Sequence, residues 1–203
     1  MATTRREKAA ETEAALKAAA RRVFAERGYL NTKISDITAA AGRATGSFYN
    51  HFSGKEELLE ALLRDLLAVA DEAVAGVEGH DSDFRRIEAV RWHVEVYWRF
   101  YKTHLAEMTA VRQAAMADPD LGRRLQRILA DDARHLAGHL AELPGSRSSP
   151  ELRLSAYYAL LDGFAHTWLV VNPADGLTIT DEQAVDVLTD LLHHGLAGVP
   201  PTG

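Results

Sequence analysis

Apolar residues recur at helical spacing along most of the chain, and short polar segments separate the runs. The first run spans residues 4–27 and places four apolar side chains at i, i+4, i+7 and i+8: Leu16, Ala20, Val23 and Phe24. This spacing predicts an amphipathic helix. Because glycine readily adopts the left-handed conformation found at helix ends, we expect this helix to end at Gly28.

Two very short apolar runs come next. One ends at Gly42 and the other before Ser53; their apolar residues are Ile34, Ile37 and Ala41 in the first, and Phe48 and Phe52 in the second. Each is shorter than the ~12 residues at which an isolated helix becomes marginal in water. We therefore expect packing on the first helix and on the segment that follows to hold both.

A longer helix is predicted to start after Ser53. Ser53 and Glu56 have the spacing of a capping box, in which two side chains satisfy the first backbone N–H groups of a helix. Six leucines follow and cover more than one face: Leu58, Leu59, Leu62, Leu63, Leu66 and Leu67. A helix that is apolar on two sides is expected to lie between two bodies.

The rest of the chain has helical spacing as well. The expected helices cover about residues 82–117 with a break near His104, 118–143, 151–171 and 181–196. Ser149 before Pro150, and Thr180 with Gln183, are typical of helix starts. No segment has the pattern of a strand longer than a few residues, so the sequence predicts an all-α fold of about nine helices.

Composition limits the possible function classes. The 203 residues include no cysteine, which excludes a disulfide scaffold, a thiol nucleophile and a zinc site built on thiolates. The length is enough for one or two domains with a real core. No apolar run approaches the ~20 residues that cross a bilayer, and no targeting segment precedes the first helix. We expect a cytoplasmic protein with no membrane partner.

Charge divides the chain into two parts. The whole chain has a formal net charge of −6, yet residues 1–55 carry ten Lys and Arg against five Asp and Glu. A basic N-terminal segment on an acidic body is typical of a protein in which one small module meets phosphate. A chance fluctuation in charge is the alternative interpretation.

Residues 32–55 have the pattern of a helix-turn-helix, with two short helices joined at Ala41–Ala44 and a glycine in the turn. In the second helix, Phe48 and Phe52 face inward. The outward positions then hold hydrogen-bonding groups in place of Glu and Lys: Thr45, Ser47, Tyr49, Asn50 and His51. Lys55, in the first turn of the next helix, opposes the helix dipole. A bound phosphate would compensate it, and a surface lysine without a partner is the alternative.

The sequence AGRATGSFYNHFSGKEELL, from Ala41 to Leu59, resembles the DNA-binding domain of tetracycline-repressor (TetR) family regulators. The resemblance implies a helix-turn-helix domain at residues 1–55 and a C-terminal ligand-binding and dimerisation domain at 56–203. It also implies a homodimeric repressor that binds a near-palindromic operator on double-stranded DNA. A small hydrophobic or aromatic effector would release it.

The resemblance also assigns DNA contacts to particular residues. Thr45, Ser47 and Asn50 would reach bases or phosphates, and Tyr49, His51 and Lys55 would bind backbone phosphates. Thr32 and Lys33 would contact the flanking backbone. Two residues depart from the family pattern: Ala44 stands where a capping Ser or Thr is common, and Arg43 stands where a small aliphatic residue is usual. Either Thr45 caps the helix one residue later or the cap is lost, and Arg43 is expected to add a DNA contact.

Small residues predict the dimer interface. Between residues 151 and 171 they recur every three or four positions and would let a second helix approach closely: Ala156, Ala159, Gly163 and Thr167. We expect this helix and the one at 181–196 to pair with their two-fold mates in a four-helix interface. Leu160, Leu188 and Leu192 complete the predicted contact.

Aromatic residues concentrate in 92–101 and 157–168, where TetR-like proteins build their effector pocket. The residues predicted to line it are Trp92, Tyr97, Phe100, Met108, Met116 and Phe164, with Arg99 or His166 as a polar anchor. The alternative interpretation is that each of these aromatic residues is an ordinary core residue.

The remaining residue patterns are weaker indications of function. Asp131, His135 and His139 share one helix face and could hold a metal, although an exposed His-rich face is the commoner meaning. No serine has the context of a nucleophile elbow, and no Gly-rich loop follows a strand. We therefore expect no enzymatic activity, no metal and no cofactor. The rival interpretation is a cytosolic all-helical small-molecule-binding protein or enzyme whose basic N-terminus is incidental.

Overall fold

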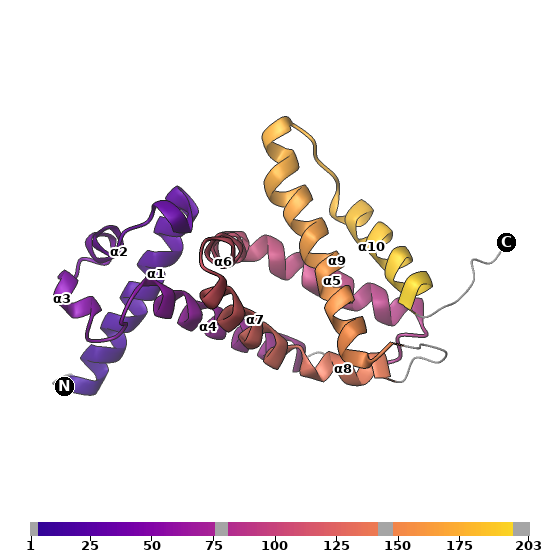
Figure 1. Cartoon of the computed structure of the whole chain (residues 1–203), viewed down its shortest axis with the longest axis horizontal. Coiled ribbons are helices and arrows are strands. Elements are labelled where there is room, and N and C mark those ends of the chain that lie inside the picture. Colours follow the sequence, from indigo (N-terminus) through magenta and orange to yellow (C-terminus); the bar gives the residue numbers. More distant parts are fainter. Residues whose placement is uncertain (1–3, 76–80, 142–147, 197–203) are drawn as a thin grey trace. The chain divides into compact units, whose positions relative to one another are not determined.

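The computed structural model describes residues 4–75, 81–141 and 148–196, which form ten α-helices and no strand (Figure 1). Their contacts divide into two units. Unit 1 comprises Met1–Val69 with Ala106–Leu129, and unit 2 comprises Ala70–Leu105 with Ala130–Gly203. The all-α prediction is confirmed. The functional boundary expected between residues 55 and 56 stays a prediction.

Unit 1 is built on the long first helix. It contains α1 (Arg5–Asn31), α2 (Ile34–Ala40), α3 (Thr45–Phe48), most of α4 (Lys55–Ala75), nearly all of α6 (Leu105–Ala117) and most of α7 (Pro119–Asp132). The core includes the apolar residues predicted from spacing, among them Leu16, Val23, Phe24, Ile37, Phe48 and Phe52. All six leucines of α4 are buried too. The two short helices are thus held by packing, as their length requires.

The end of α1 is a backbone kink at Gly28. Its φ of 72° and ψ of 162° are not helical, and residues 29–31 form a separate turn beyond it. This confirms the helix end predicted there. Beyond the kink, the Tyr29 N–H donates to Gln113 Oε1 of α6 at 2.8 Å, and Arg21 pairs with Glu107 of α6 at 3.2 Å. Two polar contacts therefore fix α1 to α6 within unit 1.

Unit 2 contains α5 (Ile87–Thr103), α8 (Arg134–Ala141), α9 (Pro150–His166) and α10 (Asp181–Leu196). Helices α5 and α10 pack antiparallel. Asp181, at the start of α10, accepts hydrogen bonds from Trp98 Nε1 at 2.8 Å and Lys102 Nζ at 2.7 Å near the end of α5. At the other end, His193 Nε2 lies 3.1 Å from the Arg85 carbonyl just before α5. Lys102 and Trp98 lower the pKa of the Asp181 carboxyl.

Most helix starts and stops follow the sequence. The break at His104, the Ser149 cap before Pro150 and the Thr180–Gln183 capping box are all present. Beyond His166, α9 continues as a π-helical turn over Thr167–Val171 and a 3-10 turn over Asn172–Asp175, and Gly176 ends it with φ 76°.

Three predictions of local structure were wrong. The helix expected over 118–143 is two helices, α7 and α8. Ser53 does not pair with Glu56: its N–H and hydroxyl both donate to Glu57 at 2.7 Å, because α4 begins at Lys55, one residue later than a cap at Ser53 requires. The recognition helix α3 has only four residues, and turns cover 49–51. In the described residues, no helix is both long and apolar enough to cross a membrane.

Burial of Tyr157 predicts alkaline sensitivity. Burial, with Tyr158 nearby, raises the pKa of the Tyr157 hydroxyl above its ordinary value of 10.0. Above pH 10 the unfolded chain therefore loses this proton while the folded chain keeps it. The free energy of unfolding should fall by about 1.4 kcal/mol per pH unit on this account. Urea unfolding between pH 9 and 11 should show a shallower fall for Tyr157→Phe. Tyr49→Phe, at a side chain 57% exposed, should behave like the wild type; equal slopes in all three proteins would contradict the prediction.

Candidate DNA-binding surface

The helix-turn-helix is formed by α2, the turn at residues 41–44 and α3. Gly42 supplies the left-handed turn with φ 63°, and the Arg43 N–H donates to the Thr38 carbonyl at 2.9 Å. Phe48 and Phe52 are buried on the inner side, with ring centroids 5.6 Å apart. The motif predicted from spacing is therefore present, with its second helix anchored by two phenylalanines.

The outer side of α3 and its following turn presents hydrogen-bonding groups. Thr45, Tyr49 and Asn50 are exposed, and Ser47 and His51 are half-buried. The Thr45 hydroxyl lies 3.4 Å from that of Thr38. The structure thus brings all five predicted residues into one short stretch that can face DNA.

Ala44 leaves α3 without a side-chain cap. It occupies the N-cap position with extended backbone, φ −70° and ψ 146°, and no side chain accepts a hydrogen bond there. Thr45 is inside the helix and does not cap it. Of the two alternatives from the sequence, loss of the cap is the one observed.

A cap restored at this position should stabilise the domain. In Ala44→Ser, the new hydroxyl can accept from a free N–H of the first turn, which is worth about 1 kcal/mol. Urea unfolding should show this gain in the free energy of unfolding. Ala39→Ser, at an exposed position inside α2, adds a serine without a cap and should give no gain. Equal effects of both variants would rule out the missing cap as the reason.

Of the two residues expected to contact the flanking DNA backbone, Lys33 is accessible and Thr32 is buried. Lys33 is exposed, and its N–H donates to Asp36 Oδ2 at 2.9 Å at the start of α2. Thr32 is buried, and its hydroxyl donates to the Gly28 carbonyl at 2.7 Å. The expectation that the Thr32 side chain contacts DNA was wrong, because this hydroxyl secures the kink at Gly28.

The ammonium of Lys55 is bound within the protein. It donates to the carbonyls of Tyr29 at 2.7 Å and Thr32 at 2.8 Å, and it lies 4.1 Å from the centroid of the Tyr29 ring. These carbonyls follow the end of α1, where the helix dipole favours a cation. Burial lowers the pKa of the ammonium. Lys55 therefore joins the end of α1 to the start of α4, and its compensation needs no external phosphate.

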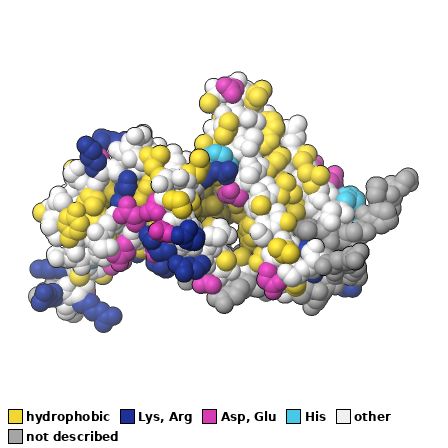
Figure 2. All heavy atoms as spheres, viewed as in Figure 1, with side chains coloured by type: hydrophobic (Ala, Val, Ile, Leu, Met, Phe, Trp, Pro, Cys, Tyr) yellow, Lys and Arg dark blue, Asp and Glu magenta, His cyan; other side chains and the backbone are white. Residues whose placement is uncertain are grey.

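Arg43 is also held by the protein. Its Nη2 lies 3.2 Å from Glu11 Oε1 of α1, and its Nε is enclosed. Other cations remain at the N-terminal end of α1: Arg5, Arg6 and Lys8 are exposed, and Lys and Arg side chains gather at the lower left of Figure 2. The exposed basic residues of the segment thus include Lys33, Arg22 and the first turn of α1.

The residues predicted for an effector pocket do not form one group. Trp92, Tyr97, Phe100, Phe164 and His166 are half-buried in unit 2. Some make separate ring contacts: Trp92 with His93 at 4.8 Å, Tyr97 with Tyr158 at 6.0 Å, Phe100 with His104 at 5.0 Å and Phe164 with Trp98 at 6.1 Å.

Three pocket assignments need correction or restriction. Arg99 is exposed, and Met116 is 80% exposed, so neither lines an enclosed site. Met108 is buried, but it belongs to unit 1, as Met116 does.

The possible metal face of Asp131, His135 and His139 stays a prediction, because the His135 side chain lies outside the described residues.

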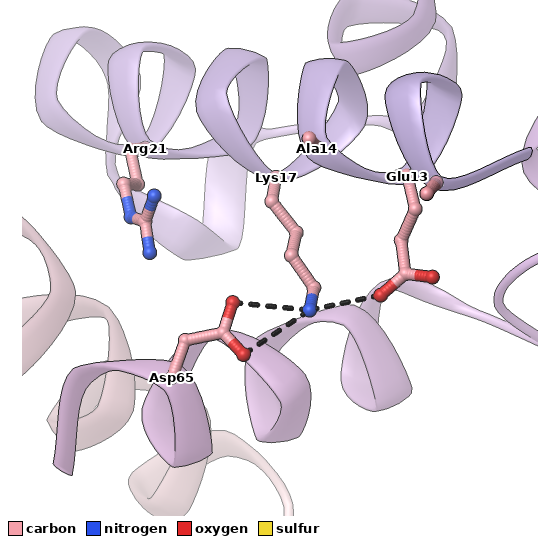
Figure 3. Close-up of a pocket in the computed structure, with 6 residues that line it drawn as sticks. Glu13, Ala14, Lys17, Arg21 and Asp65 are labelled. Carbon is pink, nitrogen blue, oxygen red and sulfur yellow. Dashed lines mark hydrogen bonds and ion pairs between the residues drawn. The ribbon is translucent and has the colours of Figure 1, made fainter. Parts of the chain in front are cut away.

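A hollow between α1 and α4 is lined by Ala10, Glu13, Ala14, Lys17, Arg21 and Asp65 (Figure 3). Lys17 lies between two carboxylates, 2.9 Å from Glu13 and 3.0 Å from Asp65. Arg21 pairs with Glu107. Both cations are thus neutralised by residues of unit 1, and the hollow lacks the aromatic lining expected of the effector pocket.

The predicted dimer residues fall on two different faces. Ala156, Ala159 and Thr167 are exposed on α9, and Leu160 and Gly163 are half-buried. Leu188 and Leu192 are only 1% and 2% exposed, so their assignment to an interface was wrong. The apolar residues of α10 lie on two sides of the helix. Leu188 and Leu192 are on the side that faces the core of unit 2. The exposed apolar residues of α10 are Val187 and Leu191.

Comparison with known proteins identifies the DNA-binding segment. Residues 16–62 match the family model described as "Bacterial regulatory proteins, tetR family". The chain is 29% identical over 209 aligned residues to the HTH-type transcriptional regulator TtgR of Pseudomonas putida, covering 92% of this chain and 94% of TtgR. It is 49% identical over 45 residues to the HTH-type transcriptional repressor KstR2 of Mycobacterium tuberculosis, covering 22% of each chain.

Solved structures share the fold across nearly the whole chain. FadR of Bacillus subtilis, solved in complex with stearoyl-CoA, superposes with a TM-score of 0.70 and 19% identity over 92% of this chain and 98% of that one. The TetR-family regulator PfmR of Thermus thermophilus gives 0.60 and 23% over 90% and 98%. The helix-turn-helix geometry, the family model and the full-length relatives agree: residues 16–62 are a DNA-binding segment of the kind found in tetR-family bacterial regulatory proteins, and the chain is similar along nearly its whole length to transcriptional regulators.

Proposed function

We propose that the protein is a homodimeric repressor that binds a near-palindromic operator through α3 and is released by a small-molecule effector bound in unit 2. The observation that carries the DNA-binding part is the exposed face of Thr45, Tyr49 and Asn50, presented by a helix anchored at Phe48 and Phe52. Hydroxyl and amide groups at these positions can bond base edges and phosphates in the major groove. Because its proposed target is DNA, we propose that the protein acts in the cytoplasm.

The effector part of the proposal is supported by relatives. FadR of Bacillus subtilis is solved in complex with stearoyl-CoA, and the relatives named above are regulators or repressors, which are not enzymes. Unit 2 contains most of the aromatic side chains, and several of them are half-buried. We propose that the effector binds among them, with Trp92 and Phe164 as apolar contacts.

The dimer is proposed to form through α9 and α10. On α9, Leu152 is 66% exposed and continues into Ala156, Ala159 and Gly163 at helical spacing. Apolar side chains are visible along α9 in Figure 2. Val187 and Leu191 provide the matching exposed positions on α10. Small residues on α9 would let the two-fold mate approach closely, which a four-helix interface requires.

Lys33 and Lys55 give a test of the DNA contact. Lys33→Ala should weaken binding to all sequences about equally and reduce the slope of log K against log salt by about 1, because it removes one phosphate contact. Lys55→Ala should leave the slope unchanged and lower the free energy of unfolding by about 2 kcal/mol, because its charged hydrogen bonds are internal. Fluorescence anisotropy at several salt concentrations, with urea unfolding, separates the two. A wild-type protein that binds no duplex at low salt would support the rival interpretation of a carrier.

A further inference from the structure

The buried face of α9 includes a charged residue. Arg153, Tyr157, Leu161 and Ala165 follow one another at four-residue spacing, and all four are buried. Three of them are the apolar or aromatic residues that such a face needs. Arg153 occupies the first position and is only 8% exposed.

No acceptor for this guanidinium is found among the described residues. Its Nε and Nη1 are both enclosed and without a hydrogen-bond partner, and no carboxylate of the described part of unit 2 pairs with it. Arginine does not lose its charge in a protein. A buried charge without a partner is strongly unfavourable, and native structures place a counter-charge or a ligand beside it. Among the described residues, no counter-charge therefore lies against the Nε and Nη1 of Arg153.

One helical turn after Arg153, Tyr157 belongs to a cluster of aromatic side chains. The Tyr157 ring is 6.1 Å from the ring of Phe84, which also contacts His93 at 4.8 Å and His139 at 5.6 Å. We call Phe84, His93, His139 and Tyr157 the Phe84 cluster. It joins the segment before α5 to α5, α8 and α9. A buried cation beside rings from several helices has the composition of a small-molecule site, in which a few polar groups orient a mainly apolar ligand.

We propose that Arg153 binds the oxyanion of an amphiphilic ligand, a carboxylate or a phosphate, whose apolar part packs against the Phe84 cluster. The planar guanidinium can bind either group through two parallel hydrogen bonds. This inference rests on the proposed effector function and gives the chemical class of the effector. The sequence offered Arg99 or His166 as the polar anchor; the proposal puts the buried Arg153 in that role.

Thermal unfolding of the ligand-free protein tests the missing counter-charge. Arg153→Met keeps the length and apolar stem of the side chain and removes the uncompensated charge, so its Tm should rise by about 3 °C or more. Arg99→Met, at an exposed position of α5, is the matched control and should leave the Tm within about 1 °C. A lower Tm for Arg153→Met would show that the protein itself pairs the guanidinium, and would overturn the proposal.

Titration calorimetry of the full-length protein tests the ligand class with decanoate, decyl phosphate and decan-1-ol. The wild type should bind at least one anion tenfold or more tightly than the alcohol, and the preferred anion distinguishes carboxylate from phosphate. Arg153→Met should lose this preference, while Arg99→Met keeps it. A wild type that binds neither anion more tightly than the alcohol, or an Arg153→Met variant that keeps the preference, would contradict the site.

Operator release by the same anion is measured separately. Release by the wild type that Arg153→Met abolishes supports both the site and the effector function. Binding through Arg153 without release supports the site and contradicts its role as the effector site. Release that persists unchanged in Arg153→Met contradicts the site and leaves the effector function standing.

Discussion

Gly28→Ala should lower the free energy of unfolding by about 2–3 kcal/mol. The reason lies in the backbone: φ 72° with ψ 162° is a region open to glycine and strained for any residue with a Cβ. The added methyl would also lie 3.1 Å from Gln113 Oε1 and 3.3 Å from its Nε2. The same amide accepts the Tyr29 N–H, so strain at the kink is expected to loosen the contact between α1 and α6.

Gly46→Ala is the matched control for this prediction. Gly46 lies inside α3, nothing lies within 4 Å of an added Cβ, and its φ is not positive. Alanine there should stabilise the protein by about 0.5–1 kcal/mol, because it restricts the unfolded chain more than the folded one. Urea unfolding of both variants measures the difference. A Gly28→Ala protein as stable as the wild type would contradict the strain assigned to this kink.

Gly163→Leu should convert the proposed dimer into monomers and weaken operator binding by about 100-fold or more. An added Cβ at Gly163 meets no atom within 4 Å in the single chain. The protomer therefore has room for a Cβ at this position, and the larger leucine side chain is expected to act on a helix that approaches α9 from outside. Without the dimer, each recognition helix binds its half-site alone and loses the effective concentration that linkage provides.

Gly138→Leu gives the control for this second prediction. Gly138 lies in α8, outside the proposed interface, and also has nothing within 4 Å of an added Cβ. Sedimentation should show monomers for Gly163→Leu and dimers for Gly138→Leu, with unchanged thermal stability in both protomers. Dimers in both variants would place the interface elsewhere.

Features that depend on neighbouring residues were predictable from the sequence. Gly28, Gly42 and Gly176 all adopt positive φ, and two of them mark the turns expected from the pattern. The inward phenylalanines of α3 and the Thr180–Gln183 cap follow from spacing alone. Local signals of this kind need only the residues within one or two turns.

Features that depend on distant backbone or on competing faces were not predictable. The dipole conflict at Lys55 was visible, yet its solution lies in carbonyls 23 and 26 residues away. On α10, Leu188 and Leu191 have the same side chain, and only packing on α5 decides that the first is buried and the second exposed. The burial of Arg153 had a signal in the sequence, its four-residue spacing from Tyr157, but arginine is seldom found buried, so this spacing alone did not predict it.

The central claim is sequence-specific DNA binding by a pair of α3 helices, and footprinting of the region upstream of the protein's own gene tests it most directly. The account predicts two protected half-sites related by a two-fold axis. Their centres should lie about 34 Å apart or a multiple of it, and protection should weaken steeply as salt is raised. Protection of a single unpaired site, or none at low salt, would contradict it.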